Sequence, residues 1–491
     1  MTPMPGLASF RYRLISTVFL LVAVASAQSP PAAMLSPVVK EYVKFDDDVI
    51  ALTHVRVIDG TGAPARADQT IILRNGRTEA MGDAVSTAVP KNAKVLDLPG
   101  YSVMPGLVGM HDHLFYPQSI NLAGRRVGGQ LQFEQQSSFS FPRLYLAAGV
   151  TSLRTTASVE PYADVNLKAW IDAGRIPGPK IHVTGPYLEG KGNYRLPVHE
   201  LTGPDDARKQ VEFWADQGVT SFKAFMHITR AELAAAIEAA HKRGLKITGH
   251  LCSISFREAA ELGIDNVEHG FVIDTSLVPT KKPDVCPSYE EKFAVFRTLD
   301  PESAPVRDLF RTLIQHHVAV TSTLAGMESY MTDHPVLQQR VLDVMSPQAQ
   351  AGFLARRLEF TPQPDLLKKE MELELAFFKA GGFLMAGPDP TGIGGTVAGF
   401  GDQRQVEILV EAGFTPLEAI HIATSNGAQF LGELDSIGTI AAGKQADLIL
   451  VRGDPSTKIS DIENLEIVFK DGVGYDSAKL IDSVRGLVGL R

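Results

Sequence analysis

Between residues 103 and 431, short β-rich runs alternate with segments whose apolar residues recur at helical spacing. The runs include "GVTSLRTT", "GVTSFKAFM", "LKITGH", "NVEHG" and "GGFLMAGPD", and with the opening stretch "MPGLVGMHDH" they count eight. Strands that are separated by helices pair in parallel, because each helix carries the chain back across the sheet. Eight such units predict an α/β fold, a (β/α)8 TIM barrel with its chemistry at the carboxyl ends of the strands.

The segments that flank this region are rich in strands and turns instead. Residues 28–102 contain "VIALTHVRVIDG" and "TIILRNGRTEAMG", in which Asn75-Gly76 predicts a hairpin turn. Residues 432–491 show the same pattern of short β-rich runs and turns, with "ADLILVRGDP" and "LEIVFKDGVGYD". The two segments therefore predict a small β-sandwich attached to a barrel that spans residues 103–431.

The first 27 residues have the pattern of a secretory signal peptide. Arg11 and Arg13 precede the apolar stretch "LISTVFLLVAVASA", which closes on the small residues Ala25-Ser26-Ala27. A membrane anchor is the alternative, but the stretch is shorter than the roughly 20 residues that a spanning helix needs. We expect residues 1–27 to be removed and the product to be periplasmic or secreted.

Composition narrows the class of partner. The chain has 491 residues, 44% of them apolar, which is enough to bury a large core. Its net charge of −9 argues against nucleic acid, which would favour clustered Lys and Arg. We expect a small-molecule substrate, no nucleic acid and no membrane span after signal cleavage. Assembly into a homo-oligomer stays open.

The first barrel strand ends in two histidines with one aspartate between them. Side chains two apart on a strand point to the same face, so His111 and His113 point together while Asp112 points away. At the catalytic end of a barrel strand such a pair makes half of a metal site. The alternative is a solvent-facing pair at a strand end.

Later strands each deliver one polar residue to the same end of the barrel. Lys223 ends "VTSFK", His250 ends "LKITGH", His269 follows "NVE" and Asp389 follows "GGFLMAGP". A buried lysine can lose its proton, and the neutral amine can add carbon dioxide to give a carbamate with two oxygens, enough to bridge two metal ions. The alternatives are an ion-paired or snorkelling lysine and, for Asp389, a helix N-cap.

In these residues the chain resembles the amidohydrolase superfamily, most closely its imidazolonepropionase-like and prolidase-like branch. The resemblance runs from about residue 49 to the end and implies two divalent metal ions, zinc being the expected metal. It also implies their ligands, in chain order, which are His111, His113, carboxylated Lys223, His250, His269 and Asp389. The chain departs from the branch at Pro388, where Thr is common, and at Thr155, where an acid is common.

This ligand set implies a mechanism. Two divalent ions would lower the pKa of a shared water towards about 7, so that hydroxide becomes available at neutral pH to attack the scissile carbonyl. Asp389 is expected to take the water's proton and pass it to the leaving amine.

The residues expected to contact substrate are less sharply marked. Arg154 could hold a substrate carboxylate or pair with a neighbouring acid, and His182 could face the barrel interior or be a satisfied core histidine. Tyr194 and His199 lie on the glycine-containing loop after strand three, and His227 follows Lys223 by one helical turn.

Two long insertions follow the sixth and seventh predicted strands, and one of them contains a cysteine. Residues 271–310 are expected to form an ordered loop and residues 324–378 to be helical, both over the catalytic face. Cys252 and Cys286 are the only cysteines, and in an exported chain we expect them to form a disulfide that pins the first insertion over the site. A buried thiol at Cys252 or an additional metal ligand are the alternatives.

Taken together, the sequence predicts a binuclear amidohydrolase that cleaves the amide bond of a dipeptide or an N-acyl amino acid. A mononuclear deaminase of the same superfamily would need no bridging lysine, and a catalytically dead binding protein would be expected to have lost a ligand. Lactones, esters and cyclic amides stay open as substrates.

Overall fold

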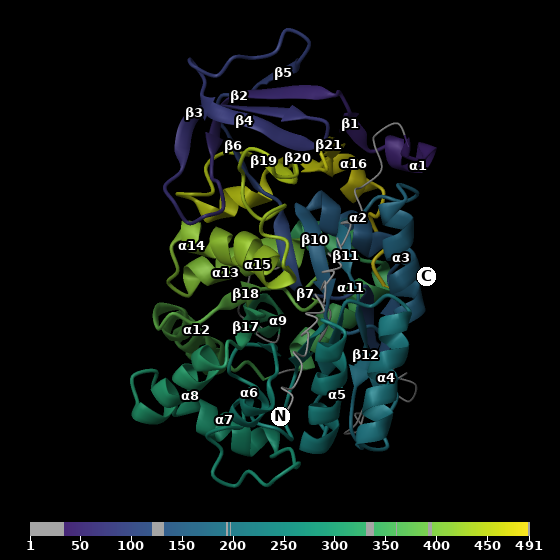
Figure 1. Ribbon diagram of the computed structural model, residues 1–491, viewed down its shortest axis with the longest axis vertical. Coiled ribbons are helices and arrows are strands. Elements are labelled where there is room, and N and C mark those ends of the chain that lie inside the picture. The colour runs from purple at the N-terminus through teal and green to yellow at the C-terminus, as the bar shows by residue number, and fades with distance from the viewer. Residues whose placement is uncertain are drawn as a thin grey trace, which may run out of the picture.

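The computed structural model describes residues 34–119, 132–192, 195–196, 198–329, 338–359, 361–390 and 395–489. The predicted signal peptide and Tyr194 lie outside these residues. A strand-rich layer formed by both ends of the chain lies at one end of the molecule, and the α/β region makes up the rest (Figure 1).

Eight strand positions form the predicted parallel core. They are β7 (Leu107–Asp112), β10 (Val150–Thr155), β11 (Lys180–His182) with β12 (Thr184–Leu188), β14 (Ser221–Ala224), β15 (Lys246–Gly249), β16 (Asn266–Glu268), β17 (Ala319–Ser322) and β18 (Leu384–Ala386). Neighbouring strands pair in parallel in the order in which the chain forms them. The fold is thus of the TIM-barrel type, as the alternating pattern predicts.

The hydrogen-bonded ladder of the described strands is interrupted at two places. Val183 separates β11, which pairs with β10, from β12, which pairs with β14. Between β18 and β7, the backbone N–H of Asp389 donates to the carbonyl of His111 at 3.0 Å. This bond joins the last strand position to the first, at the level of the predicted ligands.

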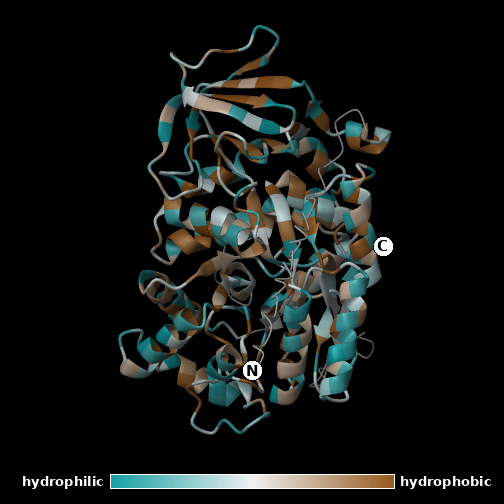
Figure 2. Ribbon diagram, viewed as in Figure 1, coloured by the Kyte–Doolittle hydropathy of each residue, from teal (hydrophilic) through white to brown (hydrophobic). Residues whose placement is uncertain are grey.

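Helices follow the strands and cover their outer faces. They are α2 (Ser140–Ala147), α3 (Pro161–Asp172), α4 (Pro204–Asp216), α5 (Arg230–Lys242), α6 (Phe256–Leu262), α8 (Ala304–Gln315), α12 (Pro364–Lys379) and α13 (Phe400–Glu411). Thr229 caps α5 and Ser255 caps α6 through reciprocal hydrogen bonds with a glutamate three residues later. Figure 2 shows hydrophobic residues along the central strands and hydrophilic residues along outer helices such as α4.

Both ends of the chain build one mixed nine-stranded sheet. Its strands are β1 (Val43–Phe45), β2 (Val49–Val57), β3 (Arg66–Arg74), β4 (Arg77–Asp83), β5 (Lys94–Asp97), β6 (Tyr101–Pro105), β19 (Leu448–Arg452), β20 (Leu465–Lys470) and β21 (Val473–Asp476). β19 pairs with β6, and apolar side chains of both segments share one buried cluster. The hydrogen bonds describe a single sheet, so the two layers of a sandwich stay a prediction.

The predicted hairpin at Asn75-Gly76 is confirmed. It joins β3 to β4, with Arg74 opposite Arg77, and both turn residues have positive φ, 49° and 78°. A Cβ on Gly76 would lie only 2.7 Å from the carbonyl oxygen of Asp471, so glycine also lets the turn approach the C-terminal segment.

The insertions after strands six and seven differ in how well the sequence predicts them. The described parts of residues 324–378 are mostly helical, as expected, with α9 (Leu324–Glu328), α10 (Gln339–Val344), α11 (Pro347–Glu359) and α12. Residues 271–310 are not a plain loop, because they contain α7 (Tyr289–Arg297) and the start of α8. Ser288 and Glu291 form a capping box that begins α7.

Shorter elements complete the described chain. They are β8 (Phe115–Ser119), β9 (Gln132–Gln136), β13 (Arg195–Leu196), α1 (Pro37–Lys40), α14 (Pro416–His421), η2 (Ile422–Asn426), α15 (Gly427–Leu431), η3 (Ile459–Glu463) and α16 (Ser477–Asp482). Strands β8, β9 and β13 form a small sheet from segments that follow the first and third strand positions. Within the described ranges, no helix has the length and apolar character needed to span a bilayer.

Candidate metal centre at the carboxyl ends of the strands

The histidine pair of β7 is buried, with His111 0% and His113 1% exposed. Each ring has its Nδ1 bonded to the protein, His111 to Glu268 Oε2 at 2.7 Å and His113 to the carbonyl of Ala157 at 3.3 Å. The two Nε2 atoms face Asp389, at 3.7 Å and 3.4 Å from its Oδ1. The pair therefore converges on one point, as the strand spacing predicts.

Asp112, between the two histidines, belongs to a different environment. Burial raises the pKa of its carboxyl, as does the neighbouring carboxyl of Asp402, whose own pKa burial raises to about 8. A Cβ built on Gly109 would meet both carboxyl groups, which places them together on that side of the strand. Asp112 thus points away from the histidine pair, as expected.

Two further histidines adjoin this point. The ring of His269 lies 4.4 Å from the ring of His111 and 4.4 Å from that of His250, between centroids. Its Nδ1 is 3.0 Å from Thr323 Oγ1 and 3.6 Å from Asp389 Oδ2, while its buried Nε2 has no hydrogen-bond partner in the described part of the chain. A buried ring nitrogen left in this way is costly unless something binds it, and a metal ion would do so.

The protonation states suit metal binding. Burial lowers the pKa of His111, brings that of His113 to about 3 and lowers that of His269 well below its usual value. Burial alone would raise the pKa of Asp389, but its contacts with these histidines hold it well below the usual range. At neutral pH the centre offers neutral imidazoles and one carboxylate, the forms in which these groups bind metals.

Lys223 lies on β14 next to the same point. Its side chain is buried, and its Nζ is 3.4 Å from His111 Nε2. The aromatic rings of Tyr187 and Phe225 flank it, with centroids 5.5 Å and 5.9 Å from Nζ. The sequence-predicted residues His111, His113, Lys223, His250, His269 and Asp389 are thus all brought together.

The backbone is strained at two of these positions. His269 has φ 64° and Asp389 has φ 49°, in the left-handed region that disfavours side chains with a Cβ. Such strain costs on the order of 1 kcal/mol per residue and is concentrated at functional sites. Keeping His and Asp where glycine would relieve the strain indicates that these side chains have a function.

A cation could be held by the group His111, His269 and Asp389, whose candidate ligand atoms all lie within 4.8 Å of one another. His113, Lys223 and His250 lie next to this group. Histidine nitrogens and carboxylate oxygens are among the ligands that zinc binds.

An apolar wall lies beside these donors. Phe115 packs against His113 with centroids 4.5 Å apart, and Phe225 packs against His250 at 5.0 Å. These rings belong to a buried cluster with Tyr187 and Met226. Apolar surroundings exclude water and strengthen every charge interaction at the centre.

Of the two roles expected for Arg154, the structure supports pairing with a neighbouring acid over holding a substrate carboxylate. Arg154 lies inside the barrel and is 1% exposed, with Nη2 2.7 Å from Glu268 Oε1 and Nη1 3.0 Å from Asn266 Oδ1. Its Nε donates to the carbonyl of Met110 at 3.1 Å. Protein acceptors engage all three nitrogens, so the expected role in holding a substrate carboxylate is not favoured.

The other expected substrate residues also have protein partners. His182 pairs with Glu433, which follows α15, and Phe430 of α15 contacts Lys246 at the start of β15. His182 is therefore directed towards the amino ends of the strands, away from the candidate centre. His199 bonds to Asp206 at 2.8 Å on the outer surface.

His227 lies closer to the centre but is engaged by Glu189. The Glu189 carboxylate accepts the backbone N–H of His227 at 2.7 Å and lies 3.4 Å from its Nδ1. The bond to Glu189 raises the pKa of His227. These contacts favour a structural role, and Tyr194 lies outside the described residues.

Sequence reasoning missed Glu268, which is 0% exposed and contacts both His111 and Arg154. A charged residue that follows the apolar Val267 in a predicted inner strand was the available signal, because buried charges need partners. Strand alternation hid it, since a residue adjacent to His269 is expected to face the opposite side.

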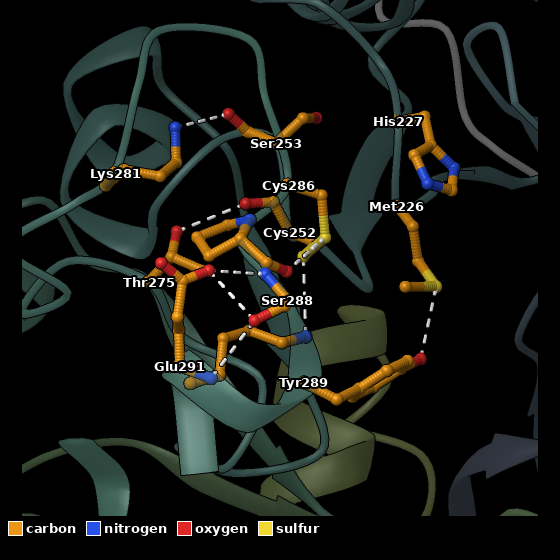
Figure 3. Close-up of a disulfide and its surroundings, with 12 residues drawn as sticks. Met226, His227, Cys252, Ser253, Thr275, Lys281, Cys286, Ser288, Tyr289 and Glu291 are labelled. Atoms are coloured by element: carbon orange, nitrogen blue, oxygen red, sulfur yellow. Dashed lines mark hydrogen bonds between the residues drawn. A yellow bond between two sulfur atoms is a disulfide. The ribbon is translucent and has the colours of Figure 1, made fainter. Parts of the chain in front are cut away.

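The structure pairs Cys252 with Cys286 (Figure 3), which have their Cα atoms 4.9 Å apart and are separated by 34 positions in the sequence. Thr275 Oγ1 donates to the carbonyl of Cys252, and Lys281 Nζ donates to that of Ser253. Tyr289, at the start of α7, has its hydroxyl directed at Met226. The bond ties the segment before α7 to the residue two positions after His250.

Removing this bond is expected to destabilise the protein. Closing a loop of this length restricts the unfolded chain by about 4 kcal/mol in the chain-entropy model. We expect Cys252→Ala/Cys286→Ala to lower the thermal unfolding midpoint, measured by calorimetry, and reductant to lower it only in the wild type. Separately alkylated Cys252 and Cys286 peptides from unreduced protein would contradict the pairing.

The close approach of β18 to β7 depends on Gly387. A Cβ there would lie 2.1 Å from the backbone nitrogen of His111, where only backbone movement could relieve the clash. Gly387→Ala is therefore expected to separate the strands, to cost about 3 kcal/mol and to weaken zinc binding. Gly352→Ala is the control, because its Cβ would meet nothing within 4 Å. Equal melting temperatures and zinc affinities of the two variants would contradict this account.

Comparison with known proteins shows which family the chain belongs to. The Amidohydrolase family matches residues 102–345 and 379–474. A dihydroorotase of Syntrophus aciditrophicus is 41% identical over 71 residues, 14% of this chain and 16% of that protein, so the match spans about a sixth of the relative.

Solved structures share the fold over most of the chain. A Xaa-Pro dipeptidase with bound methionine in the active site has a TM-score of 0.63 at 19% identity, covering 87% of this chain and 100% of that one. The bottromycin amidohydrolase has a TM-score of 0.65 at 19% identity, with coverage of 93% and 94%. The family match extends over most of the chain and includes every candidate ligand. The chain therefore belongs to the amidohydrolase family.

Proposed function

We propose that the protein is a binuclear metal-dependent amidohydrolase that cleaves the amide bond of a dipeptide or an N-acyl amino acid. The observation that carries this proposal is the convergence of six donor side chains on one buried point, around the group His111, His269 and Asp389. A mononuclear deaminase would not require a lysine among them, and Lys223 lies 3.4 Å from His111.

The chain's own residues would hold two divalent ions, zinc being the expected metal. The ligands would be His111, His113, Lys223, His250, His269 and Asp389. Lys223 would serve as a carbamate, formed when its neutral amine nitrogen attacks carbon dioxide and releases one proton. When bound, the ions supply a nucleophile at neutral pH and polarise the scissile carbonyl.

Asp389 would move the proton. Its carboxylate is ionised at neutral pH, because its histidine contacts hold its pKa low, so it can accept the proton of the attacking water. It would then deliver that proton to the nitrogen of the leaving amine as the carbon–nitrogen bond breaks. The aromatic wall of Phe115, Tyr187 and Phe225 would exclude bulk water and contact an apolar part of the substrate.

Two proteins of similar structure support the proposed substrate class. They are a Xaa-Pro dipeptidase and a prolidase complexed with N-methylphosphonate-L-proline. The activity named for the first protein and the compound bound to the second both involve a bond to the nitrogen of an amino acid. Cyclic amides and lactones are the alternative substrates.

The test is hydrolysis of a dipeptide and N-acyl amino acid library by zinc-loaded protein, with amino acid release as the readout and metal content measured in parallel. About two zinc ions per chain and release of amino acids are expected, and His111→Ala should abolish both. One ion per chain with ammonia release would instead indicate a deaminase. Turnover only of cyclic amides or lactones would overturn the proposed substrate class.

We also propose the domain plan and location. Residues 1–27 would direct export to the periplasm or medium, residues 28–102 and 432–491 would close into a β-sandwich, and residues 103–431 would form the barrel. The signal-like pattern and the Cys252–Cys286 pairing support export, because disulfides persist in oxidising compartments. Mass spectrometry of protein recovered from the periplasm should find a chain that begins at Gln28.

A further inference from the structure

We infer that Glu268, held in place by Arg154, is a positioning residue that fixes His111 for metal binding. This inference rests on the proposed function, since it concerns a ligand of the proposed metal site. It goes beyond that function by assigning a task to two buried charged residues that do not themselves contact metal or substrate.

The three residues form a continuous chain of contacts inside the barrel. Glu268 Oε2 lies 2.7 Å from His111 Nδ1, and Glu268 Oε1 lies 2.7 Å from Arg154 Nη2. Thr248 Oγ1 also donates to Glu268 Oε1. Both oxygens of the carboxylate are thus engaged, one by the histidine and one by the groups that hold the carboxylate.

Arg154 is fixed in turn by the strands around it. Its Nη1 donates to Asn266 Oδ1 at 3.0 Å, and its Nε donates to the carbonyl of Met110, the residue before His111. The planar guanidinium therefore connects β10, β16 and β7 and sets the position of Glu268 relative to His111.

This arrangement decides which nitrogen of His111 is available. A neutral imidazole carries one N–H, and Nδ1–H donating to a carboxylate leaves the lone pair on Nε2. His111 Nε2 faces Asp389 and Lys223. A carboxylate behind a ligating histidine also makes the ring a stronger donor, and loss of such a partner costs 10- to 100-fold in metal affinity.

The other rings of the centre have a different kind of support. The Nδ1 of His113 faces a neutral oxygen, the Ala157 carbonyl, and the nearest partner of the Nδ1 of His269 is the neutral Thr323 Oγ1, with the carboxylate of Asp389, itself a candidate ligand, at 3.6 Å. Loss of Glu268 should therefore weaken the ion bound through His111 more than an ion held by ligands with neutral support.

The experiment compares Glu268→Gln with Asp447→Asn. Asp447 is also a buried carboxylate bound to a cation, 2.7 Å from Lys180 Nζ, but Lys180 begins β11 and lies at the opposite end of the strand from the centre. Zinc affinity is measured by competition with a chelating indicator, and the visible absorption spectrum is recorded with cobalt in place of zinc.

We expect Glu268→Gln to bind one zinc ion 10- to 100-fold more weakly than the wild type and to change the cobalt spectrum. Asp447→Asn should lower the melting temperature but keep wild-type zinc affinity and spectrum. Wild-type affinity and spectrum in Glu268→Gln would overturn the inference. Equal loss of affinity in Asp447→Asn would also overturn it, since the effect would then be one of stability.

A second variant covers the case in which Glu268→Gln does not fold, because it leaves Arg154 buried without its carboxylate. The double variant Glu268→Gln/Arg154→Met removes both charges and should show the same weakened zinc binding in a folded protein. Wild-type affinity in the double variant would overturn the inference. A wild-type chain that binds no zinc would instead overturn the proposed function.

Discussion

Asp389→Asn is expected to lower kcat about 1,000-fold while KM changes by less than a factor of three. The amide cannot accept the proton of the attacking water, and this loss is felt in the transition state more than in substrate binding. The measurement is steady-state hydrolysis of the best substrate from the library, with zinc content determined for each preparation.

The control for Asp389 is Asp164→Asn. Asp164 is another buried carboxyl, but it accepts hydrogen bonds from Ser158 and Gln136 rather than facing the histidine group. It should retain at least a third of wild-type kcat. A small fall in kcat with a large rise in KM for Asp389→Asn would make Asp389 a substrate contact instead of the proton carrier.

Lys223→Ala should reduce bound zinc from about two ions per chain and remove nearly all activity. The variant lacks the amine that would form the bridging carbamate, so the two ions would lose a shared anionic ligand. Short carboxylic acids should restore part of the activity, because their two oxygens can replace those of the carbamate. The measurements are metal content and turnover with increasing formate, acetate and propionate.

Lys292→Ala is the matched control for this variant. Lys292 is also a buried lysine, but its Nζ contacts the sulfur of Cys252 and the ring of Tyr289. Its loss should leave zinc content unchanged and give no response to carboxylic acids. Two zinc ions and normal turnover in Lys223→Ala would rule out a bridging role for Lys223.

The candidate ligands could be predicted because strand geometry determines where they point. Each lies at the end of an apolar run, and parallel strands of one barrel bring their carboxyl ends together. The pair His111 and His113 needed only the two-residue period of a strand, and the structure confirms that both face the same point.

Three features were not predicted from the sequence, and each has a local structural cause. Arg154 looked like a rim residue, but whether a strand residue lies at the rim or one layer below depends on register between strands, which a single sequence does not contain. Glu268 escaped notice because His269, with φ 64°, breaks the alternation of β16, so that two adjacent side chains reach the same region. The start of α7 was predictable in principle, since Ser288 and Glu291 have the spacing of a capping box.

The pairing of β6 with β19 has a consequence for how the protein matures. Only Gly106 separates β6 from β7, the strand that carries His111 and His113, and Tyr101 of β6 bonds to Glu466, 365 residues later in the chain. The neighbour of β6 on one side, β2, is made early, but because a ribosome releases the chain from its amino end, the neighbour on the other side, β19, is made almost last. The sheet that leads into the first histidine strand would thus stay incomplete until the tail emerges, and a chain that ends before β19 should fold less stably than the full chain.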